Sequence, residues 1–280
     1  MILLDGQTLA DTKKQTLTQA VAALSITPQL AIVQVGDDQA SSVYVGRKET
    51  FGKEIGTEVA VHKLPADTTT EVAVELVRSL SENHGVHGII VQLPVPAHIN
   101  KELVINAISP EKDVDGLTAR NLWNLMDDKR GIVPATARGV ATLLTAYNVD
   151  LEGSHVVIVG DSLLVGKSCA VHFLNQNATV TVCHDKTKNL SSFTKQADIL
   201  VVAVGKPGLI SNLHVTEGQV VVDVGITRLP DGKVVGDVDF ESVKGVVGAV
   251  TPVPGGVGPL TVVSLFENLL AAVAPTKVGM

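Results

Sequence analysis

The chain has 280 residues and a mass of 29.3 kDa, enough for one large domain or two of ordinary size. Apolar residues make up 45% of it and charged residues only 18%, which excludes a disordered chain. A formal charge of −7 together with 3% aromatic residues argues against nucleic acid as a partner.

Short apolar runs alternate with helical patterns in the first part of the chain. We predict an initial helix over about 7–24, strands at 30–36, 59–64 and 88–92, and helices at about 41–55 and 70–82. The strand runs are almost continuously apolar, as in parallel strands buried on both faces, and the helices suit βαβ crossovers. On helix 70–82, Val72, Leu76 and Leu80 are expected to form the buried stripe.

A second series of strands follows a segment of weak periodicity, 110–134, which we expect to hold a hinge. Strands are predicted at 155–160, 179–183, 199–204 and 220–224, and helices at about 166–175, 191–196 and 261–273. The predicted fold class is therefore α/β, with two lobes and a last helix that returns to the first lobe.

A glycine-rich turn leaves the strand at 155–160 and enters a helix, as a phosphate-binding turn does. Its spacing from Gly160 to Gly166, with Ser162 between, is GxSxxxG rather than GxGxxG, so a tight turn required only for packing is an equal alternative. Asp185 follows the next strand, about 20 residues further on, where an acid recognises a ribose 2′-hydroxyl.

The acids near this turn bear on the choice of cofactor. Asp161 and Asp185 would both repel a 2′-phosphate, which favours NAD. Lys167, Lys186 and Lys188 could offset that repulsion, so the residues leave NAD and NADP open.

A cluster of polar residues is expected in the first lobe. Tyr44 and Lys48 are four residues apart and share one face of a helix that follows a strand end. Gln92 ends another strand, before two prolines, and would lie near them if the strands are neighbours. A partly buried lysine can act as an acid or base, although a surface lysine is the ordinary alternative.

Two further segments can line a ligand site. Asp113 and Asp115 precede a glycine and can form a turn, an ion site or a hydrogen-bonding site. The segment 251–261 is rich in proline and glycine, and either lets the backbone approach a flat ligand or merely links the lobes. The eight histidines lack a metal-binding spacing, so we predict no metal.

Other features concern the cellular setting. Cys169 and Cys183 are expected to be small core residues rather than a disulfide framework. The start of the chain does not resemble a signal peptide, and no apolar run approaches the roughly 18 residues of a membrane helix. The sequence therefore predicts a cytoplasmic protein without a membrane partner.

These segments together resemble the bifunctional methylenetetrahydrofolate dehydrogenase/cyclohydrolase family, known in bacteria as FolD. The matches lie in family order over nearly the whole chain: Ser41 with Tyr44–Lys48, Val91–Pro96, Pro110–Gly116, Gly160 with Gly166, Gly205–Gly208 and Thr251–Pro259. The VQLP, KDVDG and PGGVGP blocks are highly specific.

The resemblance implies oxidation of 5,10-methylenetetrahydrofolate by NAD(P)+ and hydrolysis of the methenyl product to 10-formyltetrahydrofolate. Lys48 would be the general acid/base, Gln92 would hold it, Tyr44 would position the reacting centre and Asp115 would bind the pterin. The remaining folate contacts would be Ser41, Pro254, Gly255, Gly256 and Gly258, and the cofactor contacts Gly160, Asp161, Ser162, Gly166, Asp185, Gly205 and Ile226.

The resemblance also implies a division of the chain and an assembly. The folate-binding catalytic domain would span 1–118 together with the returning helix 260–280, and the Rossmann NAD(P)-binding domain would span 119–259. Partners would be tetrahydrofolate derivatives and a second copy of the chain in a homodimer.

The chain departs from the family pattern at four places. Asp161 and Asp185 replace residues that are often basic or small in NADP-using relatives, so we expect NAD to be tolerated or preferred. Ser168 replaces a proline, and Pro134–Gly139 reads PATARG where relatives have PxTPxG. The last two concern helix entry and are expected to leave the chemistry intact.

The residues leave three alternative functions open. Another two-lobe Rossmann oxidoreductase would need a basic anchor for a substrate carboxylate and has no use for Tyr44, Lys48, Gln92 and Asp115 together. A non-catalytic folate or nucleotide binder would yield no methenyl product. A monofunctional member of the family would carry out only one of the half-reactions.

Overall fold

The computed structural model describes residues 1–273, with the backbone alone for Gln39 and Ala40. The chain forms two units, each built from separate segments. We call them the three-stranded lobe, with residues 12–135 and 262 onward, and the six-stranded lobe, with residues 1–11 and 136–261.

The predicted boundaries differ from this division at three places, the shortest being residues 260–261, which belong to the six-stranded lobe. Residues 1–11 belong to the six-stranded lobe because β1 (Ile2–Leu3) pairs in parallel with β11 (Ala249–Val250). Residues 119–135 belong to the three-stranded lobe, where Asn121 is bonded to Asp113 at 2.9 Å. Of the predicted returning helix, residues 274–280 lie outside the described residues.

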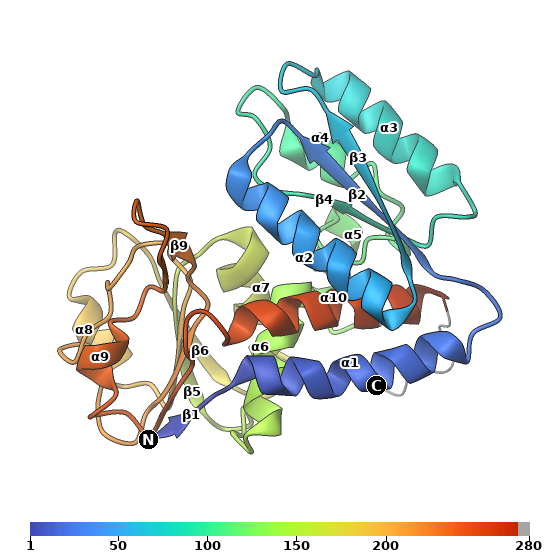
Figure 1. Cartoon of the computed structure of the whole chain (residues 1–280). Helices are drawn as coiled ribbons and strands as arrows, with labels where there is room; N and C mark the ends of the chain where they lie inside the picture. Colours follow the sequence, from blue (N-terminus) through green and yellow to red (C-terminus); the bar gives the residue numbers. More distant parts are fainter. Residues whose placement is uncertain (274–280) are drawn as a thin grey trace. The chain divides into compact units, whose positions relative to one another are not determined.

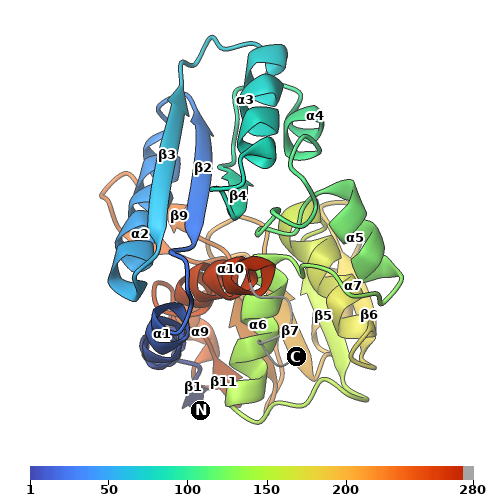
Figure 2. The same cartoon turned by 90° about the vertical axis from the view of Figure 1, so that its right-hand side faces the viewer.

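The three-stranded lobe contains a parallel sheet in the order β3-β2-β4 (Figures 1 and 2). Its strands are β2 (Gln29–Val35), β3 (Glu58–Leu64) and β4 (Gly88–Val91), which confirms the three predicted runs. Its helices are α2 (Gln39–Ile55), α3 (Thr70–Glu82), α4 (Lys101–Ile105) and α5 (Ala119–Met126). Helices α1 (Gly6–Ala22) and α10 (Val257–Val273) are divided between the two units.

Helix α3 buries a different stripe from the predicted one. Ala73, Val77 and Leu80 face the core, whereas Val72 is 53% exposed and Leu76 is partly buried. Two overlapping apolar stripes share Leu80, and packing against the sheet selects the one that starts at Ala73. The prediction for Val72 was therefore wrong.

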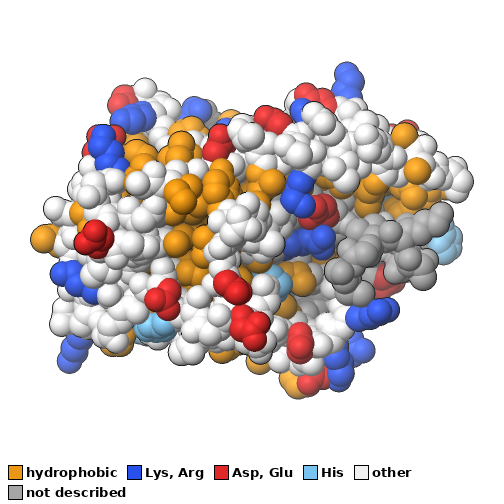
Figure 3. All heavy atoms as spheres, turned by 90° about the horizontal axis from the view of Figure 1, so that it is seen from below, with side chains coloured by type: hydrophobic (Ala, Val, Ile, Leu, Met, Phe, Trp, Pro, Cys, Tyr) orange, Lys and Arg blue, Asp and Glu red, His pale blue; other side chains and the backbone are white. Residues whose placement is uncertain are grey.

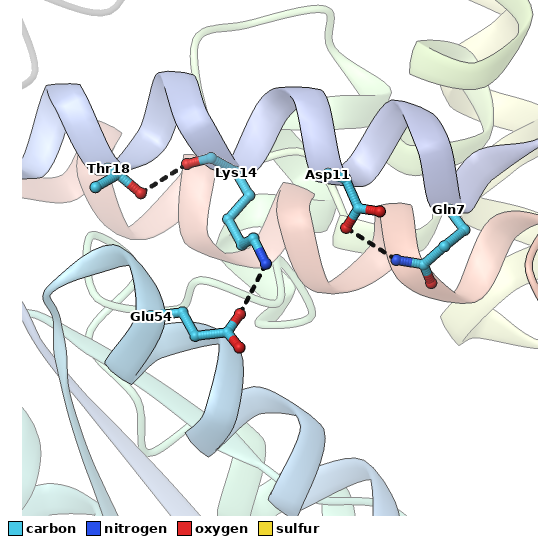
Figure 4. A network of polar contacts seen from close by, with 5 residues as sticks. All are labelled: Gln7, Asp11, Lys14, Thr18 and Glu54. Carbon is cyan, nitrogen blue, oxygen red and sulfur yellow. Dashed lines mark hydrogen bonds and ion pairs between the residues drawn. The ribbon is translucent and has the colours of Figure 1, made fainter.

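Polar contacts fix the solvated face of α1. Figure 4 shows Lys14 extending toward Glu54 of α2, with 2.9 Å between Nζ and Oε2. In the first turns of α1, Gln7 Nε2 donates to Asp11 Oδ1 at 3.1 Å, an i, i+4 pair. The Thr18 hydroxyl donates to the carbonyl of Lys14. The helix thus has a polar outer surface, while Leu17 and Val21 are buried.

The segment 110–134 contains more order than its weak periodicity suggested. Helix α5 begins after Thr118, whose hydroxyl accepts from Asn121 N at 3.4 Å. The Asn121 amide also donates to the carbonyl of Pro110 at 2.8 Å. Side-chain bonds thus define the start of α5, and the helix has only eight residues, too few for a periodicity argument to identify with ease.

The six-stranded lobe contains a parallel sheet in the order β1-β11-β8-β7-β5-β6. Beyond β1 and β11, its strands are β5 (His155–Val159), β6 (Thr179–Cys183), β7 (Ile199–Val202) and β8 (Val220–Asp223), as predicted within one or two residues. A hairpin of β9 (Thr227–Arg228) and β10 (Val234–Val235) is separate. The helical segments are α6 (Ala135–Ala146), the π-helical turn η1 (Leu163–Lys167), α7 (Ser168–Leu174), α8 (Leu190–Thr194) and α9 (Phe240–Val243).

The strand order determines where a ligand can bind in this lobe. The chain passes from β5 to β6 on one side and then returns across β5 to β7 on the other. The carboxyl ends of β5 and β7 therefore form a topological switch point, where open α/β sheets bind ligands. Cys169 and Cys183 are buried free thiols, which confirms their prediction as core residues.

The surface shows no strong segregation of charge on the face drawn in Figure 3, where acidic and basic side chains are interspersed among hydrophobic ones. Within residues 1–273, no helix combines the length and apolarity needed to cross a membrane. In the same residues, no group of three or more His, Cys, Asp or Glu side chains is placed to hold a metal ion.

Candidate active site

The three-stranded lobe brings Lys48 and Gln92 together, as the sequence predicted. Strand β4 lies beside β2, and Gln92 N donates to Val33 O at 2.8 Å just past the strand end. Lys48, in the middle of α2, donates from Nζ to Gln92 Oε1 at 2.9 Å. The Gln92 amide nitrogen donates to Leu93 O at 2.7 Å, which orients the amide oxygen toward the lysine.

Lys48 and Asp115 perturb one another. Burial lowers the pKa of Lys48, and the negative charge of Asp115 partly opposes this. The pKa of Asp115 is raised to about 6, mainly by burial. The positive charge of Lys48 opposes this rise, and the negative charge of Asp113 adds to it. Near neutral pH, Lys48 can therefore lose a proton more easily than an ordinary lysine, as a general acid/base requires.

The two acids of the Asp113–Asp115 pair have different surroundings. Asp113 is 1% exposed and accepts from Gly116 N at 3.0 Å, Thr118 N at 2.7 Å and Asn121 Nδ2 at 2.9 Å. Gly116 has a φ of +73°, and a Cβ there would approach the backbone of Pro134 at 2.8 Å. Asp113 thus closes the turn, which leaves Asp115 as the acid that interacts with Lys48.

Asn268 is a site-supporting residue that the sequence did not reveal. It lies on α10, 1% exposed, and its Nδ2 donates to Val114 O at 2.9 Å and to Val133 O at 3.0 Å. It therefore fixes the backbone beside Asp115 from a position 153 residues later in the chain. No local pattern signals such a contact.

Tyr44 and Ser41 complete this end of α2. Tyr44 is half-buried, and this burial raises the pKa of its hydroxyl. The positive charge of Arg47, whose Cζ lies 5.8 Å from the ring centroid, opposes part of the rise. Ser41 is buried and its hydroxyl donates to Leu93 O at 3.4 Å, the same carbonyl that Gln92 contacts. The four side chains Ser41, Tyr44, Lys48 and Gln92 thus belong to one local constellation.

In the six-stranded lobe, the glycine turn lies at the switch point. Gly160 has a φ of +120°, and its amide donates to Cys183 O at 2.8 Å, which joins the ends of β5 and β6. A Cβ at Gly160 would overlap the carbonyl of Ala203, and one at Gly166 would overlap the carbonyl of Gly160. Both glycines are therefore required for packing, and the turn also has the strand-to-helix geometry that dinucleotides use.

The helix that follows the turn begins with a π-helical segment. Ser162 precedes it and accepts from Val165 N at 3.3 Å, while the Ser168 hydroxyl donates to Leu163 O at 2.5 Å. Ser168, which replaces a family proline, thus supplies a side-chain bond at the helix entry. Asp161 and Ser162 are exposed, so both are accessible to a ligand.

Asp185 follows β6, next to the glycine turn. Its side chain is 75% exposed and forms an ion pair with Lys186, with 2.7 Å between Oδ2 and Nζ. The acid is therefore where the sequence placed it, and part of its charge is compensated by the adjacent lysine.

The remaining predicted positions surround the same sheet edge. Gly205 is exposed, with a φ of +73° and open space where a Cβ would be. Ile226 is 38% exposed, and a Cβ at Gly258 would contact its Cδ1 at 3.6 Å. Gly256 packs on Gly6, and Gly255 O accepts from Gln7 N at 2.9 Å. Pro254–Gly258 thus contains the end of the connection after β11 and the first residues of α10, with Pro254 exposed.

Comparison with known proteins identifies the family. The model of the tetrahydrofolate dehydrogenase/cyclohydrolase catalytic domain matches residues 4–115, and that of the family's NAD(P)-binding domain matches residues 134–277. The chain belongs to the tetrahydrofolate dehydrogenase/cyclohydrolase family. Its resemblance to FolD proteins over nearly the whole sequence is thereby confirmed.

Individual relatives match nearly the whole chain. The chain is 49% identical to the bifunctional protein FolD of Francisella philomiragia over 96% of each chain, and 47% identical to that of Halalkalibacterium halodurans, covering 97% of this chain and 98% of that protein. The structure of bifunctional FolD from Campylobacter jejuni superposes with a TM-score of 0.96 at 44% identity, covering 98% and 99% of the two chains.

A FolD structure from Trypanosoma brucei, in complex with NADP and an inhibitor, has a TM-score of 0.94 at 34% identity, covering 100% of this chain and 99% of that one. The two-domain architecture with a Rossmann-type NAD(P)-binding domain, predicted from the sequence, is thus confirmed.

Proposed function

We propose that this chain oxidises 5,10-methylenetetrahydrofolate with NAD(P)+ and hydrolyses the methenyl product to 10-formyltetrahydrofolate. Membership of the dehydrogenase/cyclohydrolase family supports both reactions. The observation that carries the proposal within the molecule is the 2.9 Å bond from Lys48 Nζ to Gln92 Oε1, beside an acid whose pKa is raised to about 6.

Lys48 is the acid/base of the hydrolytic step. Water must lose a proton as it adds to the methenyl carbon, and a ring nitrogen must gain one when the ring opens. A lysine whose pKa burial has lowered is suited to both, because it loses its proton more readily than an ordinary lysine. Gln92 holds Nζ in place by accepting one of its protons.

Asp115, Tyr44 and Ser41 bind and orient the folate. Asp115 is held beside Lys48 and can be protonated near neutral pH, so it can both donate and accept a hydrogen bond, as a pterin edge requires. Tyr44, one turn before Lys48, offers a flat face to the reacting centre.

The dehydrogenase step needs orientation more than proton transfer. Hydride leaves the methylene carbon for the nicotinamide and creates a cation stabilised by nitrogen, so no base is required. Gly160, Ser162, Gly166, Gly205 and Ile226 are the proposed cofactor contacts: the turn and helix entry bind the pyrophosphate, and the loops after β7 and β8 bind the nicotinamide end.

The six-stranded lobe is an NAD(P)-binding domain, and we propose that it accepts NAD and does not require NADP. Asp161 and Asp185 are both exposed beside the glycine turn, where a 2′-phosphate would meet their negative charge. Lys186 neutralises Asp185 in part, so NADP is weakened rather than excluded. The ratio of kcat/KM for the two cofactors tests this, and a strong preference for NADP contradicts it.

The assembly and the cellular setting are also proposals. By family resemblance we propose a cytoplasmic homodimer. Light scattering of the purified chain measures its mass against 29.3 kDa for one copy, and a monomer at working concentration contradicts the homodimer.

The function as a whole is tested by two assays. Appearance of methenyl absorbance from methylenetetrahydrofolate and NAD(P)+ reports the dehydrogenase, and its loss from added methenyltetrahydrofolate reports the cyclohydrolase. Both activities are expected in one preparation. Activity in only one assay would indicate a monofunctional enzyme, and activity in neither would contradict the proposal.

A further inference from the structure

Two buried carboxyl groups in the six-stranded lobe have no part in the function described so far. Asp223 ends β8 and is 2% exposed, and Asp237 follows β10 and is 0% exposed. Both lie at the carboxyl edge of the sheet, close to the loops that carry Gly205 and Ile226.

Asp237 fixes the backbone after β7. Its Oδ2 accepts from Val204 N at 2.6 Å and from Gly205 N at 2.9 Å. These are consecutive amides at the point where the chain leaves the sheet, so a single carboxylate oxygen determines the direction of this loop. A Cβ at Gly205 would meet nothing within 4 Å, so there is open space beside this loop.

Asp223 fixes the loop after β8 and Asp237 itself. Its Oδ1 accepts from Gly225 N and from Asp237 N, both at 3.0 Å, and its Oδ2 accepts from Val238 N at 2.9 Å. Gly225 immediately precedes Ile226. The two carboxyl groups together thus join the segments after β7, β8 and β10.

The surroundings are packed around the two acids. A Cβ at Gly225 would overlap the Asp237 carboxyl group, and a Cβ at Gly236 would overlap Asp223 Oδ2. Asp237 Oδ1 is buried and has no hydrogen-bond partner among the described residues. Gly225 and Gly236 therefore leave the space that the two carboxyl groups need to reach the backbone amides. A residue with a side chain at either position would fill that space.

Burying this pair is costly. Burial raises the pKa of Asp223 to about 7, the amides of Val238 and Asp237 oppose the rise, and the charge of Asp237 adds to it. Apolar residues could fill the same volume without that cost, but they could not accept the five backbone protons. What the pair provides is a defined backbone at the switch point, which is where a dinucleotide binds.

We propose that Asp223 and Asp237 are positioning residues for the dinucleotide. They do not touch it; they fix from behind the loops that present Gly205 and Ile226 to it. The inference rests on the proposed NAD(P) site of this lobe. It assigns the pair a role in cofactor binding that is separate from the folate chemistry at Lys48.

The experiment compares Asp237→Asn and Asp223→Asn with the wild-type chain. Binding of NADH and of NADPH is measured directly by nucleotide fluorescence, and the dehydrogenase and cyclohydrolase assays are run in parallel. We expect the Kd for NADPH and the KM for the cofactor to rise roughly tenfold or more in each variant. Cyclohydrolase activity on added methenyltetrahydrofolate, which needs no dinucleotide, is expected to stay within about twofold of wild type.

Asp198→Asn is the matched control. Asp198 lies in the same lobe and also accepts a backbone amide, from His155 at 2.7 Å, but at the amino end of β5 and β7. It is expected to leave the Kd for NADPH unchanged. An equal rise in the control would show that any lost carboxylate in this lobe weakens the cofactor, which contradicts a specific role.

The outcomes separate the inference from the function on which it rests. Wild-type affinity for NADPH in both variants overturns the positioning role and leaves the dehydrogenase intact. A parallel fall of cyclohydrolase activity and melting temperature in both variants shows a merely structural pair, and also overturns it. If only one variant fails to fold, the other decides. A wild-type chain that binds neither NADH nor NADPH contradicts the proposed function instead.

Discussion

The two lobes prepare their sites in different ways. The three-stranded lobe places ionisable side chains together, with Lys48 bonded to Gln92 and its pKa lowered by burial. The six-stranded lobe offers mainly glycines and backbone, and its buried acids bond to amides behind the surface. A step that moves protons needs titratable groups, whereas a step that moves a hydride needs a rigid frame for the cofactor.

The largest expected effect comes from Lys48, which only one of the two reactions needs. Lys48→Met should lower cyclohydrolase activity by at least about 100-fold, because it removes the amine to which we assign the proton transfers of the hydration step. Dehydrogenase activity should persist, and methenyl product should accumulate in the coupled assay. Full retention of cyclohydrolase activity in a steady-state assay would refute the assigned role, with Lys53→Met on the same helix as control.

At the glycine turn, we expect a substitution to weaken the dehydrogenase and to spare the cyclohydrolase, the reverse of Lys48→Met. Gly160→Ala introduces a Cβ that overlaps the Ala203 carbonyl, at a φ of +120° that alanine tolerates poorly. The KM for the dinucleotide should rise by roughly tenfold or more, while cyclohydrolase activity is retained. Gly153→Ala, also at positive φ but with open space around the Cβ, separates backbone strain from the overlap.

A smaller effect concerns stability and pH in the three-stranded lobe. Because folding raises the pKa of Asp115 from 3.8 to about 6, the native state binds more protons than the unfolded state between these values. The free energy of unfolding should therefore fall as the pH rises from about 4 to 6, by on the order of 1–3 kcal/mol.

Asp115→Asn should flatten this part of the profile in urea titrations at a series of pH values. The lowered pKa of Lys48 acts in the other direction and in the alkaline range, where stability gained with rising pH should disappear in Lys48→Met. If the free energy of unfolding of Asp115→Asn fell between about pH 4 and 6 as it does in the wild type, the pKa of Asp115 would not be raised by folding.

The smallest effect is expected for cofactor choice, since Asp185 is exposed and already paired with Lys186. Asp185→Ser should improve kcat/KM for NADP by a few-fold, because an exposed charge is worth only about 0.2–1 kcal/mol. NAD should lose a similar factor. If the NADP/NAD ratio stays constant, Asp185 does not sense the ribose, and Asp161→Ser becomes the informative variant.

The two lobes also differ in which of their features could be predicted from the sequence and which could not. The buried parallel strands and the residues at their ends followed from local patterns, and Lys48 and Gln92 meet because β2 and β4 are neighbours. The stripe of α3 was mispredicted, since Val72 and Ala73 begin equally good apolar repeats. Helix α5 and strand β1 were missed because they have only eight and two residues, and β1 is defined by its pairing with the distant β11.

The sequence by itself determined the fold class, the family and most of the candidate site, because strand periodicity, turn chemistry and the VQLP, KDVDG and PGGVGP blocks are local properties. Tertiary structure alone decided that Asp113 closes the turn, and that Asn268 supports the backbone beside Asp115. It also brought Asp223 and Asp237 together behind the cofactor loops. The reason is physical: burial and long-range hydrogen bonds arise between residues far apart in the chain, so no local pattern encodes them.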